Sequence, residues 1–117
     1  MYPPAQQPED LDRFFVERGN AGDVEGLVAL YEEDAVLAGP DGSVIVGRDE
    51  IRRFYSGLLS QGVTFGGRIR EAIRNGDIAL TSTTRPGDAT VEVARRAPDG
   101  SWRWAIDQPR VLGSDIP

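Results

Sequence analysis

The first half of the chain carries apolar residues at the spacing of amphipathic helices. Three stretches place apolar side chains on one face and charged ones on the other, so the sequence predicts helices over residues 8–19, 23–33 and 48–60. Pro8 suits the first turn of a helix, where its missing N–H would have no partner, and Asp23 is a good N-cap. We expect these helices to lie across a sheet formed by the second half.

Beyond Gly62 the apolar spacing changes from about 3.6 residues to about two, the period of a β-strand. The sequence predicts long strands over residues 63–73, 78–84, 89–96 and 102–112. Tight-turn signals separate these strands, at Asn75-Gly76, Pro86-Gly87-Asp88 and Pro98-Asp99-Gly100. Strands joined in this way form an antiparallel meander. A short hairpin, over 35–37 and 43–46, is expected before the third helix.

Three helices followed by a bent meander favour an α+β cone. In such a fold the helices close one face of a curved antiparallel sheet and leave a pocket at the mouth. We expect residues 8–112 to form this single domain, between a flexible N-terminal arm at 1–7 and a C-terminal tail at 113–117. The N-terminal stretch lacks the basic and apolar regions of a secretory signal, which favours a cytoplasmic location.

Composition excludes several kinds of chemistry. The chain has no Cys, His or Lys, which excludes thiolate nucleophiles, imidazole bases, Schiff-base lysines and metal sites built from His or Cys. Acid–base chemistry must use carboxylates, tyrosines, arginines or water, and we expect no metal or organic cofactor. The formal net charge is -6, and the arginines are spread along the chain, so neither nucleic acid nor a membrane is an expected partner.

Several short motifs follow one another in an informative order. They are Asn20-Ala21-Gly22-Asp23, Leu27-Val28-Ala29-Leu30-Tyr31, Asp34-Ala35, Gly47-Arg48 with Ile51 and Phe54-Tyr55, and Gly100-Ser101-Trp102-Arg103. In this order the chain resembles the nuclear transport factor 2 superfamily, and within it the SnoaL-like and ketosteroid-isomerase-like branch. The resemblance covers about residues 8–112 and implies the cone-shaped fold. Because that superfamily hosts isomerases, cyclases, epoxide hydrolases, dehydratases and binding modules, the function must be argued from the site.

Ketosteroid isomerase uses a Tyr donor, an Asp base and a protonated acid. When the resemblance is followed residue by residue, the donor position falls on Phe15 and the base position on Gly39, and neither side chain can do that chemistry. The protonated-acid position falls on Glu92, and the supporting tyrosines resemble Tyr31 and Tyr55. The resemblance therefore argues against that isomerisation while still implying a lined pocket.

Two acids on the expected strands, Glu92 and Asp107, are the candidate catalytic residues. Alternation places Glu92 on the face opposite Val91 and Val93. It points either into the cone or to the solvent or dimer face, where it would pair with an Arg. Asp107 follows an uncharged stretch, where an acid is costly unless it is hydrogen-bonded. Some SnoaL-like enzymes use a strand Asp as an acid–base group; the alternative is that Asp107 holds the strand end or bonds an Arg.

Aromatic residues on the predicted helices and the last strand are the candidate ligand contacts. They are Phe15, Tyr31, Phe54, Tyr55, Trp102 and Trp104. The two tryptophans share a strand face two residues apart, so they either stack on a ligand or pack in the core. The two tyrosines are expected on helix faces, with their hydroxyls either near the pocket or bonded within the core.

These observations leave three functions open. The first is a cofactor-free SnoaL-like enzyme that performs proton transfer or hydration on a small apolar or aromatic molecule through carboxylates. The second is a non-catalytic protein that binds such a ligand, and the third is a structural dimerisation domain. In each case we expect a homodimer through the outer face of the sheet, because an open sheet needs a cover and the resembling branch commonly pairs in this way.

Overall fold

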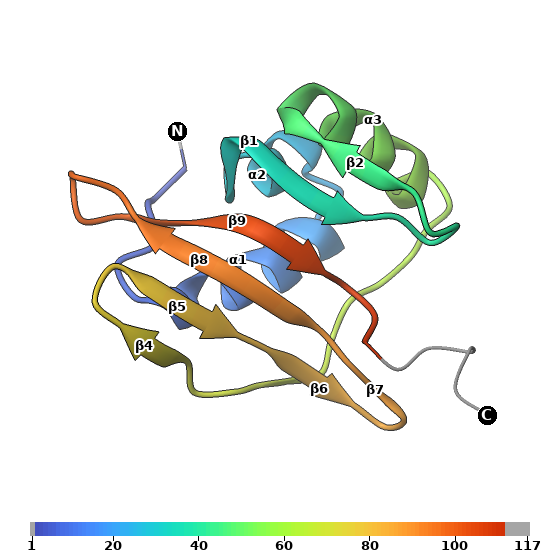
Figure 1. The fold of residues 1–117 in the computed structure, drawn as a ribbon. Coiled ribbons are helices and arrows are strands. Elements are labelled where there is room, and N and C mark those ends of the chain that lie inside the picture. The colour runs from blue at the N-terminus through green and yellow to red at the C-terminus, as the bar shows by residue number, and fades with distance from the viewer. Residues whose placement is uncertain (1, 112–117) are drawn as a thin grey trace.

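The helices lie on one side of the main sheet in the computed structural model, which describes residues 2–111 (Figure 1). They are α1 (Pro8–Asn20), α2 (Val24–Val28) and α3 (Gly47–Leu59). At the start of α1 the Asp10 carboxylate accepts a hydrogen bond from the Gln7 N–H at 3.0 Å, which satisfies a backbone donor at the positive end of the helix dipole. Helices α1 and α3 begin and end within one residue of the predicted positions.

Helix α2 is shorter than the sequence predicts. It ends at Val28, whereas the prediction continued it to residue 33, so the placement of Tyr31 on a helix face was wrong. Asp23 caps the helix as expected. Beyond the helix, the Trp104 N–H donates to the Leu30 carbonyl at 2.8 Å, and the chain enters the sheet at Tyr31. Pairing with a distant strand overrides the local helical preference.

The main sheet has the strand order β2-β1-β9-β8-β5-β4. Its strands in chain order are β1 (Tyr31–Ala38), β2 (Val44–Val46), β4 (Ile73–Asn75), β5 (Ile78–Thr81), β8 (Val91–Arg96) and β9 (Trp102–Gln108). A smaller sheet contains β3 (Arg68–Ile69), β6 (Thr83–Arg85) and β7 (Asp88–Ala89). The predicted α+β cone is confirmed. The main sheet is mixed rather than wholly antiparallel, because β1 and β9 run parallel.

Three predicted strands are interrupted. The stretch 63–73 contains only β3 and the first residue of β4. The stretch 78–84 divides at Ser82 into β5 and β6, and the stretch 89–96 divides at Thr90 into the end of β7 and β8. At Gly67, where φ is +122°, a Cβ would lie 2.8 Å from the Thr83 side chain. Only glycine fits this close approach of two backbones. Because of these interruptions, each of the three stretches contributes to both sheets.

The core lies between the helices and the inner face of the main sheet. Its largest buried side chains are Leu11, Leu27, Tyr31, Leu37, Ile51, Tyr55, Trp102 and Trp104. The outer face of the sheet also carries apolar residues, and Ile73, Leu80 and Ile106 are exposed there. Both faces of this sheet are therefore apolar, and only one of them is covered by helices (Figure 1).

The N-terminal segment that was predicted to be an arm lies against the domain. The Trp102 N–H donates to the Ala5 carbonyl at 2.9 Å, and the Arg18 guanidinium donates to the Pro3 carbonyl at 3.1 Å. The predicted domain end at residue 112 and the tail at 113–117 lie outside the described residues. Within the described part of the chain, every helix is too short or too polar to cross a membrane.

Candidate functional site

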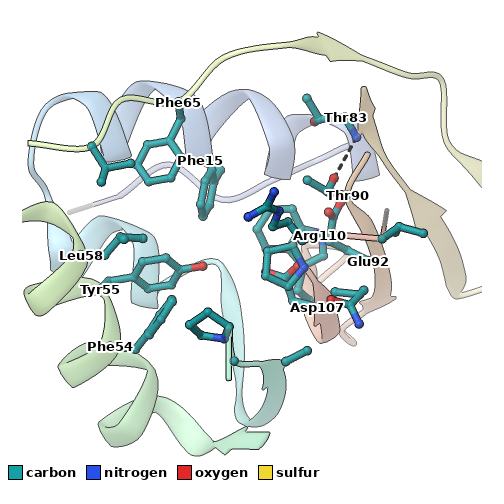
Figure 2. Close-up of a pocket in the computed structure, with 18 of the residues that line it drawn as sticks. Phe15, Phe54, Tyr55, Leu58, Phe65, Thr83, Thr90, Glu92, Asp107 and Arg110 are labelled. Carbon is teal, nitrogen blue, oxygen red and sulfur yellow. Dashed lines mark hydrogen bonds between the residues drawn. The ribbon is translucent and has the colours of Figure 1, made fainter. Parts of the chain in front are cut away.

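A cavity of about 850 Å³ opens between α1, α3 and the inner face of the sheet. Figure 2 shows its two sides: aromatic side chains stand on the helix side, and carboxyl groups stand on the strand side. The labelled residues are Phe15, Phe54, Tyr55 and Phe65 on the first side and Glu92 and Asp107 on the second. A mostly apolar cavity with a few converging polar groups is typical of a small-molecule site.

Glu92 points into the cavity from β8 and is only 3% exposed. The structure therefore shows the inward orientation of the two that the sequence left open. The Thr81 hydroxyl, on the neighbouring strand, donates to Glu92 Oε1 at 2.6 Å. Burial, and then the nearby Asp12 carboxyl, raises the pKa of Glu92 to about 9. Glu92 is consequently a neutral acid at pH 7.

Asp107 lies directly opposite Glu92, on β9, and is also buried in the cavity wall. Its hydrogen-bond donor is a tyrosine and not the arginine considered from the sequence: the Tyr31 hydroxyl donates to Asp107 Oδ2 at 2.5 Å. Burial, and then the Glu92 carboxyl, raises the pKa of Asp107 to about 8. Two carboxyls with strongly raised pKa values thus face one another.

A chain of hydroxyls leads from Asp107 to the helix side of the cavity. The Tyr31 and Tyr55 hydroxyl oxygens are 2.8 Å apart, and because the Tyr31 proton points to Asp107, Tyr55 donates in this bond. Burial raises the pKa of each tyrosine well above the ordinary value for a tyrosine, so both stay neutral. Tyr55 lines the cavity, whereas Tyr31 lies fully buried behind the wall.

Trp104 fixes the hydroxyl beside Glu92. Its Nε1–H donates to Thr81 Oγ1 at 3.0 Å, which directs the Thr81 proton to Glu92. Trp104 also lines the cavity. Trp102 is buried elsewhere in the domain, where the Arg96 guanidinium lies 5.6 Å from the centroid of its ring. Of the two tryptophans that the sequence placed on one face, only Trp104 is at this cavity.

The aromatic wall is centred on Phe15. Its ring centroid lies 5.8 Å from that of Tyr55, 4.9 Å from that of Phe65 and 5.9 Å from that of Trp104, in edge-on or tilted arrangements. Phe54 extends the wall, with its ring centroid 5.1 Å from that of Tyr55. The sequence predicted Phe65 only as a residue of the strand over 63–73. It reaches the wall because the chain around it is not in a strand.

Asp12, on α1, is a cavity residue that sequence reasoning missed. It is only 4% exposed, and its Oδ2 has no hydrogen-bond partner among residues 2–111. Burial raises the pKa of Asp12 to about 6; a side-chain hydrogen bond with Glu92 lowers the pKa, and the Asp107 carboxyl raises it. The spacing held a signal: Asp12 stands three residues before Phe15, so the two share one face of the helix.

Phe15 and Gly39, where the resemblance to ketosteroid isomerase places a donor and a base, both line the cavity. A phenyl ring cannot donate a hydrogen bond, and glycine has no side chain to accept a proton. Among residues 2–111, no group of three or more Asp, Glu, His or Cys has the geometry to hold a metal ion. The acid–base chemistry that this cavity can offer therefore rests on its buried carboxyls.

A family model described as a SnoaL-like domain matches residues 11–111 of the chain. A ketosteroid isomerase-like protein from Erwinia carotovora atroseptica has a TM-score of 0.72 and 24% identity, over 86% of this chain and 89% of that one. A domain of unknown function with a cystatin-like fold, from Nostoc punctiforme, has a TM-score of 0.74 and 19% identity, over 92% of this chain and 76% of that one. A nuclear transport factor 2-like protein from Novosphingobium aromaticivorans has a TM-score of 0.70 and 20% identity, over 94% of this chain and 82% of that one.

Proposed function

Because the chain belongs to the SnoaL-like domain family, we propose that its cavity performs cofactor-free acid–base chemistry, proton transfer or hydration, on a small apolar or aromatic molecule. One observation carries the proposal: Glu92 and Asp107 are directly opposed, buried carboxyls beside an aromatic wall. Two carboxyls held this close do not ionise together easily. Over a range of pH the pair holds one proton, so that one carboxyl is an acid and the other a base.

Each member of the pair has a distinct role in this proposal. Glu92, whose pKa is raised to about 9, is the proton donor, and the Thr81 hydroxyl holds its carboxyl in place. Asp107, whose pKa is raised to about 8, is the base once the pair has lost its first proton. The hydrogen bond from Tyr31 favours the carboxylate form of Asp107. Positioned groups of this kind accelerate a proton transfer by about 10²-fold to 10⁴-fold.

The proposal is tested with 5-nitrobenzisoxazole, a small aromatic molecule whose ring opens when one proton is removed. The wild-type protein should open the ring faster than buffer does, and the rate should rise with pH as the pair loses its first proton near pH 8. Asp107→Asn should lower the rate at least about tenfold. Glu17→Gln, which removes a carboxyl from an exposed position on α1, should leave the rate unchanged.

The Glu92→Gln variant tests whether Asp107 acts as one member of a pair or as a lone base. Removing the neighbouring carboxyl removes one cause of the raised pKa of Asp107, so the pH profile of the ring opening should move to lower pH. A wild-type rate equal to that of buffer, or one that Asp107→Asn leaves unchanged, would contradict the proposed acid–base role.

The alternative function is non-catalytic binding of a small apolar or aromatic molecule, or a purely structural role in dimerisation. The specific observation that favours binding is the aromatic wall formed around Phe15 by Tyr55, Phe65 and Trp104. Calorimetry that shows an aromatic ligand bound equally by the wild type and Asp107→Asn, with no proton transfer in either, would favour this alternative. Absence of both binding and turnover would leave the structural role.

A further inference from the structure

The cavity holds a third carboxyl that the proposed acid–base pair does not use. Glu92 and Asp107 each accept a hydrogen bond from a buried hydroxyl, but Asp12 Oδ2 has no partner among residues 2–111. Asp12 is 4% exposed and lines the cavity. A buried carboxylate oxygen without a donor is costly, and such groups are normally satisfied in a working state of the protein. The Asp12 carboxyl shares a hydrogen bond with Glu92, and its Oδ2 is left open to a donor from a ligand.

The surroundings of Asp12 suit a cationic donor. Phe15 stands one helical turn further along α1 on the same face, and its ring joins those of Tyr55 and Trp104 in the wall. Ring faces attract a cation that lies within about 6 Å of their centroids. A buried carboxylate beside several aromatic rings is thus a favourable environment for a positive charge that is attached to an apolar body.

The charged groups of the cavity also favour a cationic ligand. On the strand side, Asp12 faces two further acids, Glu92 and Asp107, whose raised pKa values keep them neutral at pH 7, so Asp12 carries the negative charge of this group. Among residues 2–111, the arginines that line the cavity are Arg85 and Arg110. Both are exposed and contact Asp88, at 3.5 Å and 3.2 Å. The single Asp88 carboxylate therefore offsets part of their charge.

We propose that the cavity recognises a small aromatic or apolar molecule carrying a protonated amine, with the ammonium group bound by Asp12 and the apolar body held against the aromatic wall. The inference rests on the proposed function in one respect, that small molecules bind in this cavity. The ammonium supplies the N–H donor that Asp12 Oδ2 lacks and offsets the charge of its carboxylate. The apolar body fills the space bounded by Phe15, Phe54 and Phe65.

Isothermal titration calorimetry at pH 7 tests the preference for a protonated amine with three probes that share an indole ring: tryptamine, tryptophol and indole-3-acetate. Tryptamine should bind at least roughly tenfold more tightly than tryptophol, because a charge-assisted hydrogen bond replaces a neutral one, and indole-3-acetate should bind most weakly. Equal affinities for tryptamine and tryptophol would overturn the amine inference and leave the cavity as a ligand site. Absence of binding by all three would also overturn it, while the ring-opening assay would still decide the acid–base proposal.

A matched pair of variants assigns the preference to one carboxyl. Asp12→Asn keeps the size of the side chain and removes its charge, so tryptamine should lose at least about tenfold in affinity while tryptophol stays within about twofold. Glu17→Gln, exposed on the same helix, should change neither affinity. Unchanged tryptamine binding by folded Asp12→Asn would overturn the role of Asp12. If that variant does not fold, the wild-type preference among the three probes still decides the inference.

Discussion

Glu92 on β8 and Asp107 on β9 are register partners whose carboxyls are both buried on the inner face of the sheet. Directly opposed side chains of an antiparallel pair have Cβ atoms about 4.5–5.5 Å apart, a distance at which like charges destabilise each other. Each carboxyl has its own hydroxyl donor, Thr81 for Glu92 and Tyr31 for Asp107. The stability of the fold is consequently linked to the protonation of this pair.

The free energy of unfolding should fall as the pH rises from about 5 to about 9. The pKa values of Glu92 and Asp107 in the folded protein, about 9 and about 8, lie above the ordinary values of 4.5 and 3.8. The unfolded chain therefore loses these protons first, and the stabilisation present at low pH is lost as the pH rises through the folded-state values. Thermal melts should show this trend, and Glu92→Gln should flatten it. A wild-type melting temperature independent of pH would contradict the expectation.

Thr81→Val should destabilise the fold by about 1–3 kcal/mol. The Thr81 hydroxyl accepts from Trp104 Nε1–H and donates to Glu92, so valine leaves the Trp104 N–H without this partner and removes one of the hydrogen bonds of Glu92. The same hydroxyl lowers the pKa of Glu92, which the variant should therefore raise further. Urea unfolding measures the cost, with Thr84→Val at a partly buried position as the control. A cost no larger than that of the control would show that the Thr81 hydroxyl is not needed.

We propose that the chain forms a homodimer through the outer face of the main sheet. A row of register partners crosses that face: Ile73, Leu80, Val93, Ile106, Val36 and Val46. Continuous apolar patches of this kind usually mark an interaction surface. Sedimentation equilibrium at micromolar concentration should show a dimer for the wild type and a monomer for Leu80→Arg and Ile106→Arg, two positions that are 44% and 53% exposed. A monomeric wild type would rule out this interface.

The purified protein should not isomerise a β,γ-unsaturated ketosteroid at a rate above background. Phe15 and Gly39 stand at the cavity where the resemblance to ketosteroid isomerase requires a hydroxyl donor and a carboxylate base. Loss of a positioned base costs about 10²-fold to 10⁴-fold, and loss of an oxyanion donor about 10²-fold to 10³-fold. A spectrophotometric assay of steroid conjugation checks this. Turnover like that of a competent isomerase would show that other residues fill these roles.

Local signals were sufficient for α1 and α3, because the residues that begin and end these helices act within one turn of the chain. They were not sufficient for Tyr31. This residue continues the apolar spacing of α2, but its position depends on parallel pairing with β9, far along the chain. Backbone pairing with a neighbouring strand outweighs the helical preference of so few residues.

The orientation of Glu92 could not be settled from the sequence for a related reason. Strand alternation separates two faces without saying which is covered. Here the face opposite Glu92 is also apolar, as Val93 and Ile106 show, so hydrophobicity did not identify the inner face. Asp12 was missed because its importance depends on residues of β8 and β9 that only the folded chain brings near it.

A carbon-13 NMR titration of the side-chain carboxyls of Glu92 and Asp107 tests the central claim most directly, because the proposed chemistry requires the pair to retain a proton at and above neutral pH. Asp107 should titrate near pH 8 and Glu92 near pH 9. In Glu92→Gln, the pKa of Asp107 should fall, since the carboxyl opposite it is gone. If both carboxyls instead titrate near the ordinary values of 3.8 and 4.5, the pair cannot share a proton at pH 7, and the proposed acid–base role is wrong.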